Sequence, residues 1–198
     1  NTTTTGDLSD PYSACTKLLL HANGIDGSTT FVNSKPFTSA TGGTITTDGD
    51  YTIHTFTSTG SSTFALNSLG SDIEYLIVGG GGAGGGNGGN AGNGGGGAGG
   101  FQTGTITPTS TGNYTVFVGA GGAKVCGNSG ENGENSYINY TGGTSVLNLT
   151  SIGGGGGAWG QTDGCDGGSG GGGGGWNASR AGGCGTSGQG NDGYSVSV

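Results

Sequence analysis

The segment Ile73-Glu-Tyr-Leu-Ile-Val-Gly-Gly-Gly-Gly-Ala-Gly-Gly85 decides the fold, because a β-type run passes directly into glycine. Its first half is rich in β-branched and aromatic residues of nearly alternating polarity, as a strand with one buried face requires. Its second half opens a stretch of Gly, Asn and Ala that ends at Gly100, and a second glycine stretch runs from Gly153 to Gly175. We therefore expect strands bracketing long glycine segments.

Glycine dominates the composition, with 55 Gly and 3 Pro among 198 residues, a share at which composition alone indicates disorder. The bracketing β-type segments argue against disorder, although 28% apolar residues allow only a small conventional core. Glycine segments can instead form threefold extended helices of the polyproline type, whose backbone donors bond to neighbouring segments. We predict a mainly β fold, with a small β-sandwich-like base, packed polyglycine helices and little or no α-helix.

The chain is expected to divide into an N-terminal arm with a β-hairpin, residues 1–43, and a glycine-rich domain, residues 44–198. The hairpin would join Thr16–His21 to Ser28–Val32, and residues 44–78 offer three further strands, with turns at Ser61-Ser62 and Gly70-Ser71. The remaining expected strands are Thr105–Thr109, Asn113–Val118, Ser145–Leu149 and Tyr194–Val198. An unpaired edge on the hairpin predicts that residues 1–20 donate a strand to an adjacent subunit.

Charge excludes two classes of partner. Only 8% of residues are charged, the net charge is −8, and the cations are Lys17, Lys35, Lys124 and Arg180. Nucleic acids and anionic membranes both require clustered cations, so neither is an expected partner. No stretch approaches the ~20 apolar residues of a membrane span, so membrane insertion is not expected either.

The four cysteines, Cys15, Cys126, Cys165 and Cys184, lack the clustered spacing and paired histidines of a zinc site. An even set favours two disulfides in an oxidising compartment, and Cys165 is expected to pair with Cys184, although three connectivities are open. Methionine is absent even at position 1, so we expect the chain to begin after a processing cut. These features predict a secreted protein.

Five N-x-S/T sequons mark candidate glycosylation sites, at Asn1, Asn113, Asn139, Asn148 and Asn177. They would be used in a eukaryotic source and silent in a bacterial or phage one. Four aromatic residues lie in or near the second glycine stretch: Tyr137, Tyr140, Trp159 and Trp176. These rings could stack on sugars or on a protein partner, but covering the flank of the glycine bundle is the favoured interpretation.

Catalytic signatures are weak. Gly167-Gly-Ser-Gly-Gly171 matches a nucleophile elbow formally, but it has no strand–turn–helix context and only His21 and His54 could serve as base. The segment Ser187–Ser195 misses a calcium-binding nonapeptide at two positions, and a plain turn is favoured there. We predict no enzymatic activity, no metal and no cofactor.

The ordered landmarks resemble a known family. They are His54-Thr-Phe56, the segment Ile73–Gly85, Gly94-Gly-Gly-Gly-Ala-Gly-Gly-Phe101, Tyr114-Thr-Val-Phe-Val-Gly-Ala-Gly-Gly122 and Gly130-Glu-Asn-Gly-Glu-Asn-Ser136. Over roughly residues 44–193 this pattern resembles the glycine-rich domain of phage tail-fibre and adhesin proteins, and it is similar to the glycine-rich region of receptors of the anaplastic lymphoma kinase group. The resemblance implies a β-sandwich-like base crowned by polyglycine helices, with loops at their ends that can recognise ligands.

Residues 18–33 separately look like the opening hairpin of a laminin-G or concanavalin-like lectin domain, but the other strands of such a domain are missing. The expected function is a structural subunit of an extracellular filament, sheath or appendage that assembles with copies of itself. The alternative is a receptor-binding adhesin of a viral, phage-type tail fibre, whose partners would be surface glycans or a cell-surface receptor.

Overall fold

The computed structural model describes residues 38–86, 92–142, 145–175 and 178–197, together with the short strands Leu20–His21 and Val32–Asn33. The chain divides into two units, Asn1–Phe37 and Thr38–Val198. In the first unit, β1 (Leu20–His21) pairs antiparallel with β2 (Val32–Asn33), with Leu20 opposite Asn33. This pairing agrees with the expected hairpin; the arm before it lies outside the described residues.

The second unit contains a five-stranded antiparallel sheet in the order β11-β10-β9-β6-β3. Its strands are β3 (Ser39–Thr41), β6 (Gly60–Ser68), β9 (Gly112–Val118), β10 (Ser136–Gly142) and β11 (Ser145–Ser151). Two further antiparallel pairs accompany it: β4 (Thr44–Asp48) with β5 (Tyr51–Thr55), and β7 (Ile73–Val78) with β8 (Phe101–Ile106). Among the described residues the fold is mainly β, as predicted.

A small apolar core lies on the inner face of the five-stranded sheet. Phe64, Leu66 and Tyr114 are buried, and Ile73 of β7 and Phe56 pack against them. Partly buried residues complete the cluster: Ala40, Leu69, Val116, Ile138, Tyr140 and Leu147. The alternation of more and less buried residues along β6 and β7 follows from the twofold side-chain period of a strand.

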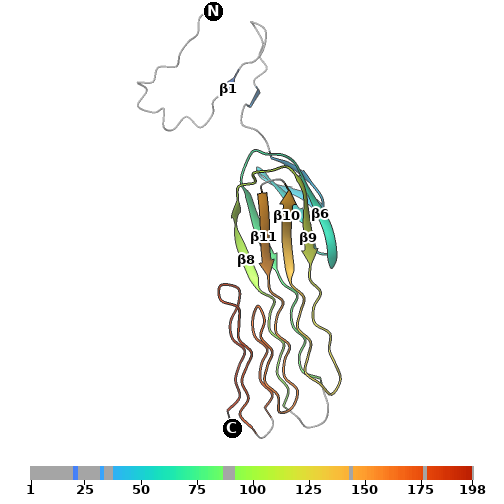
Figure 1. Cartoon of the computed structure of the whole chain (residues 1–198), viewed down its shortest axis with the longest axis vertical. Coiled ribbons are helices and arrows are strands. Elements are labelled where there is room, and N and C mark those ends of the chain that lie inside the picture. The colour runs from blue at the N-terminus through green and yellow to red at the C-terminus, as the bar shows by residue number, and fades with distance from the viewer. Residues whose placement is uncertain are drawn as a thin grey trace, which may run out of the picture. The chain divides into compact units, whose positions relative to one another are not determined.

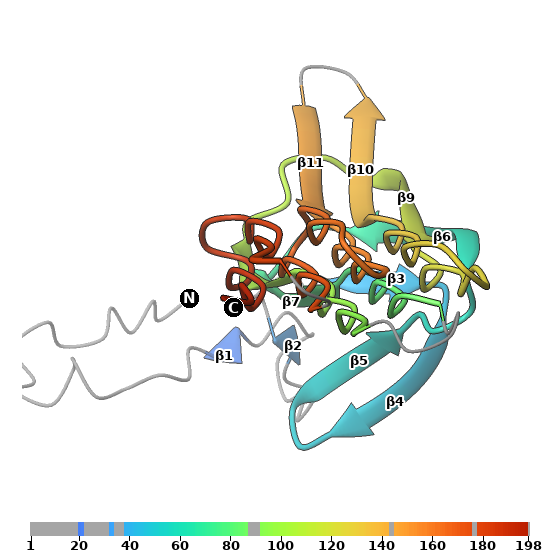
Figure 2. The same ribbon diagram turned by 90° about the horizontal axis from the view of Figure 1, so that it is seen from below.

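The strands occupy one end of the second unit, and the glycine segments extend from them at the other end (Figure 1). Figure 2 shows these segments end on, as narrow coils that lie side by side. Backbone hydrogen bonds between neighbouring segments recur at every third residue. One series, at 2.8–2.9 Å, runs from Gly79 N to Gly100 O, Gly82 N to Gly97 O and Gly85 N to Gly94 O.

The same glycine segment bonds to a second neighbour through its next residues. This series runs from Gly80 N to Glu134 O, Ala83 N to Glu131 O and Gly86 N to Asn128 O. A third neighbour donates from Gly154 N to Gly80 O and from Gly157 N to Ala83 O. Successive residues therefore face different neighbours in a threefold rotation, which is the geometry of the predicted polyproline-type helix.

Close approach of these segments requires glycine at particular positions. A Cβ added at Gly97 would clash with the backbone carbonyl of Ser169, and one added at Gly156 would clash with that of Gly130. Gly95 is different, because an added Cβ there would meet no atom within 4 Å. The backbone thus forms the interior of the bundle, and only some glycines have room for a side chain.

Several expected strands need correction. Ser61-Ser62 is not a turn but lies inside β6, and Thr105–Thr109 is displaced, since β8 spans Phe101–Ile106. Tyr194–Val198 does not form a strand in its described part, because Val196 makes only an isolated bridge to Arg180. Its neighbour Tyr194 accepts a bond from Gly173 N, as a bundle segment does. Among the described residues, no helix is long and apolar enough to cross a membrane.

Candidate functional site

Three of the five sequons occupy adjacent strands in the same arrangement. They are Asn113-Tyr114-Thr115 on β9, Asn139-Tyr140-Thr141 on β10 and Asn148-Leu149-Thr150 on β11. Because side chains alternate along a strand, the central residue points to the core and the asparagine to the outer face. Tyr114, for example, is only 4% exposed. Strand alternation together with the β9-β10-β11 pairing therefore brings three sequons onto one face.

We call this outer surface of the sheet the Asn/Thr face; its polar and aromatic members in the described part are Ser61, Thr63, Asn113, Thr115, Phe117, Tyr137, Asn139, Asn148 and Thr150. The strand register aligns them in rows across four strands. One row is Thr63, Thr115, Asn139 and Asn148, and the next is Ser61, Phe117, Tyr137 and Thr150. With strands about 4.8 Å apart, amides and hydroxyls form a lattice that contains no charged side chain.

Tyr137 stacks on Phe117 within this face, with ring centroids 5.1 Å apart and planes 9° from parallel. Beside this pair, Asn139 has a buried side-chain oxygen with no hydrogen-bond partner among the described residues. Asn148 differs, because its Oδ1 accepts a hydrogen bond from the Thr150 hydroxyl at 3.0 Å. The exposed side chains of Thr63, Asn113 and Thr115 can offer hydrogen bonds to an uncharged ligand, and the stacked rings offer an aromatic surface.

Tyr140 lies on the opposite face of β10 and stacks on Tyr114, with ring centroids 4.4 Å apart. Their hydroxyls donate to the backbone carbonyls of Thr111 and Ser110, at 3.0 and 2.8 Å. Burial raises the pKa of Tyr114 above its ordinary value, and the nearby Tyr140 raises it further. The two rings are thus tied into the core.

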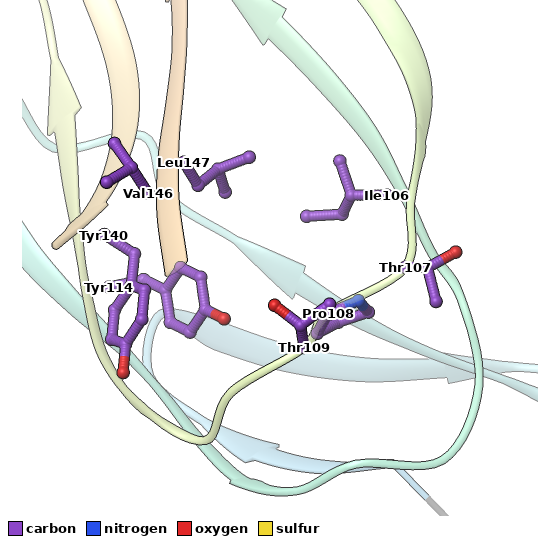
Figure 3. Close-up of a pocket in the computed structure, with 8 residues that line it drawn as sticks. All are labelled: Ile106, Thr107, Pro108, Thr109, Tyr114, Tyr140, Val146 and Leu147. Carbon is purple, nitrogen blue, oxygen red and sulfur yellow. The ribbon is translucent and has the colours of Figure 1, made fainter. Parts of the chain in front are cut away.

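These tyrosines border a hollow of about 100 Å³ between the end of β8 and the β10–β11 hairpin (Figure 3). Its other lining residues are Ile106, Thr107, Pro108, Thr109, Val146 and Leu147. Figure 3 places Leu147 and Ile106 on opposite sides of the space. The hollow is large enough for one small apolar group.

Among the described residues, the expected ligand aromatics Tyr137, Tyr140 and Trp159 do not form one site. Tyr137 and Tyr140 point to opposite faces of β10, and half-buried Trp159 belongs to a glycine segment. The Trp159 backbone N–H donates to Thr162 Oγ1, while its indole N–H is buried without a partner in the described part. Trp176, Asn1 and Asn177 lie outside the described residues.

The cysteines are not joined within the described part of the chain. Cys126, Cys165 and Cys184 are free thiols in the structure, and Cys15 lies outside the described residues. The structure therefore does not support the expected disulfide between Cys165 and Cys184. Both cysteines nevertheless lie in adjoining glycine segments, because Gly167 N donates a hydrogen bond to Cys184 O and Cys184 N donates one to Asp166 Oδ1. Disulfide formation stays a prediction.

Polar side chains in the bundle form hydrogen bonds with its backbone. Asp, Glu, Asn, Gln and Ser side chains accept hydrogen bonds from main-chain donors, in the pairs Gly119–Ser136, Ala120–Glu134, Ile152–Gln189, Gly153–Asn135, Gly156–Asn132, Ala181–Asp163, Gly182–Ser195 and Gly185–Asp192. Ser169, of the nucleophile-like motif, accepts a bond from Asn191 N. In the described residues, no three His, Cys, Asp or Glu side chains are grouped to hold a metal ion.

Gln189 belongs to no motif in the sequence, yet its side chain and backbone join three segments. Its side-chain NH₂ donates to Thr150 O at 3.1 Å, and its side-chain oxygen accepts from Ile152 N at 2.8 Å. Its backbone carbonyl accepts from Phe101 N at 3.0 Å. One glutamine therefore connects the end of β11, the start of β8 and the last glycine segment, and no local sequence pattern signals this role.

Large apolar side chains are exposed on the outer face of the β7–β8 pair. Leu76 is 62% exposed, Val78 50% and Phe101 53%, and Val78 lies directly opposite Phe101. We call these three residues the apolar strip. The β10–β11 hairpin adds Val146, which is 76% exposed. Such apolar surface is typical of contacts with another molecule.

The comparisons with known proteins identify a family for this chain. No curated protein and no solved structure matches this chain. The glycine-rich domain family, in contrast, matches residues 57–197, which include β6 to β11 and the bundle of glycine segments. Because this match covers more than half of the sequence, the chain belongs to the glycine-rich domain family.

Proposed function

We propose that this protein is a structural subunit of an extracellular filament, sheath or appendage, and that it assembles through contacts between its own copies. The apolar strip carries this proposal. Leu76, Val78 and Phe101 expose apolar surface, and a contact between subunits that removed this surface from water would be favourable.

The glycine bundle supports the same function. Its segments are joined by backbone hydrogen bonds at every third residue, so its rigidity does not depend on a large side-chain core. Such a bundle suits a spacer in an assembly. The N-terminal strand donation expected for residues 1–20 concerns residues outside the described part, and it stays a prediction.

The test is the assembly state of the purified chain, measured by light scattering over a concentration series and by negative-stain imaging. We expect assembly that grows with concentration and is weakened by the pair Leu76→Ser and Phe101→Ser. Burial of two such side chains contributes about 3 kcal/mol or more, so the change should weaken assembly on the order of a hundred-fold. Tyr194→Ser is the control, because Tyr194 is 78% exposed but lies outside the strip. A wild-type chain that stays monomeric at every concentration contradicts the proposal.

The alternative function is a receptor-binding adhesin of a viral, phage-type tail fibre, as the resemblance to phage adhesins implies. The uncharged Asn/Thr face with its Phe117–Tyr137 stack favours this candidate, because aromatic rings and amides are suited to neutral sugars. Isolated particles that bind cells or neutral glycans would support it. Tyr137→Ala should then weaken binding without changing the assembly state.

A further inference from the structure

β11 is the last strand of its sheet, so one of its sides faces no strand of the described part. The bonds to Gln189 show which residues present their backbone there: Thr150 O and Ile152 N both point away from β10. Because backbone direction alternates along a strand, the N–H and C=O groups of Asn148 and Val146 point to the same side.

Native edge strands are usually protected by charge, proline or short length. β11 has seven residues, Ser-Val-Leu-Asn-Leu-Thr-Ser, with no charged residue and no proline. At the opposite edge of the sheet, β3 has only three residues and an irregular register at Ser39/Ala40. β11 is therefore the edge that is open to pairing.

Two features indicate what covers it. The Gln189 side-chain amide donates to Thr150 O and accepts from Ile152 N, so the outward backbone groups at this end of the edge already bond to amide groups, and those farther along can bond to an extended backbone. Beside the edge, the hollow bordered by Leu147, Ile106 and Pro108 has room for an apolar side chain from an incoming strand. The occupant is thus a strand with an apolar residue on its inner face.

β11 itself meets this description. In an antiparallel register centred on Leu147, Val146 of each copy lies opposite Asn148 of the other, and the free backbone groups form two reciprocal pairs. Leu147 then lies beside Leu147 of the second copy, on the face that borders the hollow. Gln189 ends the available edge at Thr150, so the register does not displace it. We propose that β11 pairs antiparallel with β11 of a second copy of this chain.

This contact rests on the proposed self-assembling function and specifies one of its interfaces. A twofold contact between identical strands closes on itself, whereas a donated N-terminal strand would generate an open chain of subunits. With the apolar strip removed by Leu76→Ser and Phe101→Ser, the β11 contact should therefore leave a dimer, twice the 18.7 kDa of one chain.

The experiment compares Asn148→Pro with Asn148→Ala in that strip-deficient background. Proline removes the outward N–H and is tolerated at an edge, whereas alanine keeps the N–H and removes only the side chain. We expect monomers for Asn148→Pro and dimers for Asn148→Ala by light scattering. Val146→Lys, which places a charge on the edge, should also give monomers if proline disturbs folding.

Hydrogen exchange adds a direct readout, because the Val146 and Asn148 amides should exchange fast in dilute protein and slowly in the dimer. Dimers that persist in both Asn148→Pro and Val146→Lys, with these two amides unprotected, overturn the β11 contact and leave the proposed function standing. Open chains in place of dimers would also overturn it. A wild-type chain that never assembles contradicts the proposed function itself.

Discussion

Substitution of two glycines in one segment tests whether the backbone is the interior of this protein. In Gly97→Ala, the new Cβ would clash with Ser169 O and lie 2.7 Å from Gly170 O and 2.8 Å from Ser169 C. These are backbone atoms, so no side-chain rotation relieves the contact. Overpacking costs about 1–3 kcal/mol, and separation of the segments also weakens the bonds from Gly97 N to Gly155 O and from Ser169 N to Ala98 O, each worth roughly 1 kcal/mol.

The expected loss for Gly97→Ala is therefore about 2–5 kcal/mol, a large part of the roughly 5–15 kcal/mol that stabilises a typical domain. Gly95→Ala is the matched control, because its Cβ would meet nothing within 4 Å and its backbone does not lie in the left-handed region. Alanine there should stabilise by about 0.4–1 kcal/mol, since it restricts the unfolded chain. Denaturant unfolding followed by circular dichroism measures both variants. Equal stability changes at the two positions would refute the close-packed bundle.

Three further predictions concern other parts of the molecule. Gln189→Leu should lower the free energy of unfolding by about 2–5 kcal/mol in denaturant titrations, because Thr150 O and Ile152 N lose their hydrogen-bond partners. Gln189→Glu keeps a side-chain oxygen that can accept from Ile152 N, so it should lower the free energy of unfolding by less. The raised pKa of Tyr114 means that the folded state holds the Tyr114 proton more tightly than the unfolded state does. The stability that this proton contributes should therefore be fully present below pH ~10 and fall as the pH rises further. Tyr114→Phe should flatten that decline, and an alkaline unfolding curve that the substitution leaves unchanged would count against this prediction. The two expected disulfides predict that alkylation without reductant labels no cysteine, and labelling of Cys126, Cys165 and Cys184, which are free thiols in the structure, would contradict them.

The sequence predicts the elements whose local pattern agrees with their environment. Ile73–Val78 was expected as a strand with the bounds that β7 has, because its alternation is strong and glycine ends it. The threefold bundle could also be predicted, since glycine segments held between strands can satisfy their backbone donors only in neighbouring segments. In both cases the residues of the segment itself indicate the conformation that it adopts.

Other elements depend on partners that the sequence does not show. Ser136–Gly142 forms β10, although its residues are largely polar, because β9 and β11 pair with it on both sides. Ser61-Ser62 resembles a turn, but pairing with Val116 and Phe117 of β9 keeps it extended. Tyr194–Val198 has a strand-like composition, yet the adjoining glycine segment offers hydrogen bonds at every third residue, and the bundle geometry prevails.

The sequence alone could predict the residues of the candidate site but not their arrangement in space. Asn113, Asn139 and Asn148 are sequons by sequence, but their gathering on one face follows from the β9-β10-β11 order, which requires the sheet. The apolar strip depends on the Val78–Phe101 register, across more than twenty residues of intervening glycine-rich chain. Long-range pairing, not residue type, creates both surfaces.

Because backbone fills the interior of the glycine bundle, its polar residues need a different interpretation from those of a conventional domain. In a conventional domain, a buried Asp, Asn or Ser in a glycine-rich loop suggests catalysis or a metal, because side chains otherwise fill the interior. Here Ser136 is buried and Asn132 and Asp192 are exposed, yet all three accept hydrogen bonds from glycine N–H groups, so structure already accounts for them. The groups that the fold leaves unused are instead the apolar strip, the Asn/Thr face and the β11 edge. All three lie on the strand end of the second unit, and function is therefore to be sought there, with the glycine bundle as the rigid support.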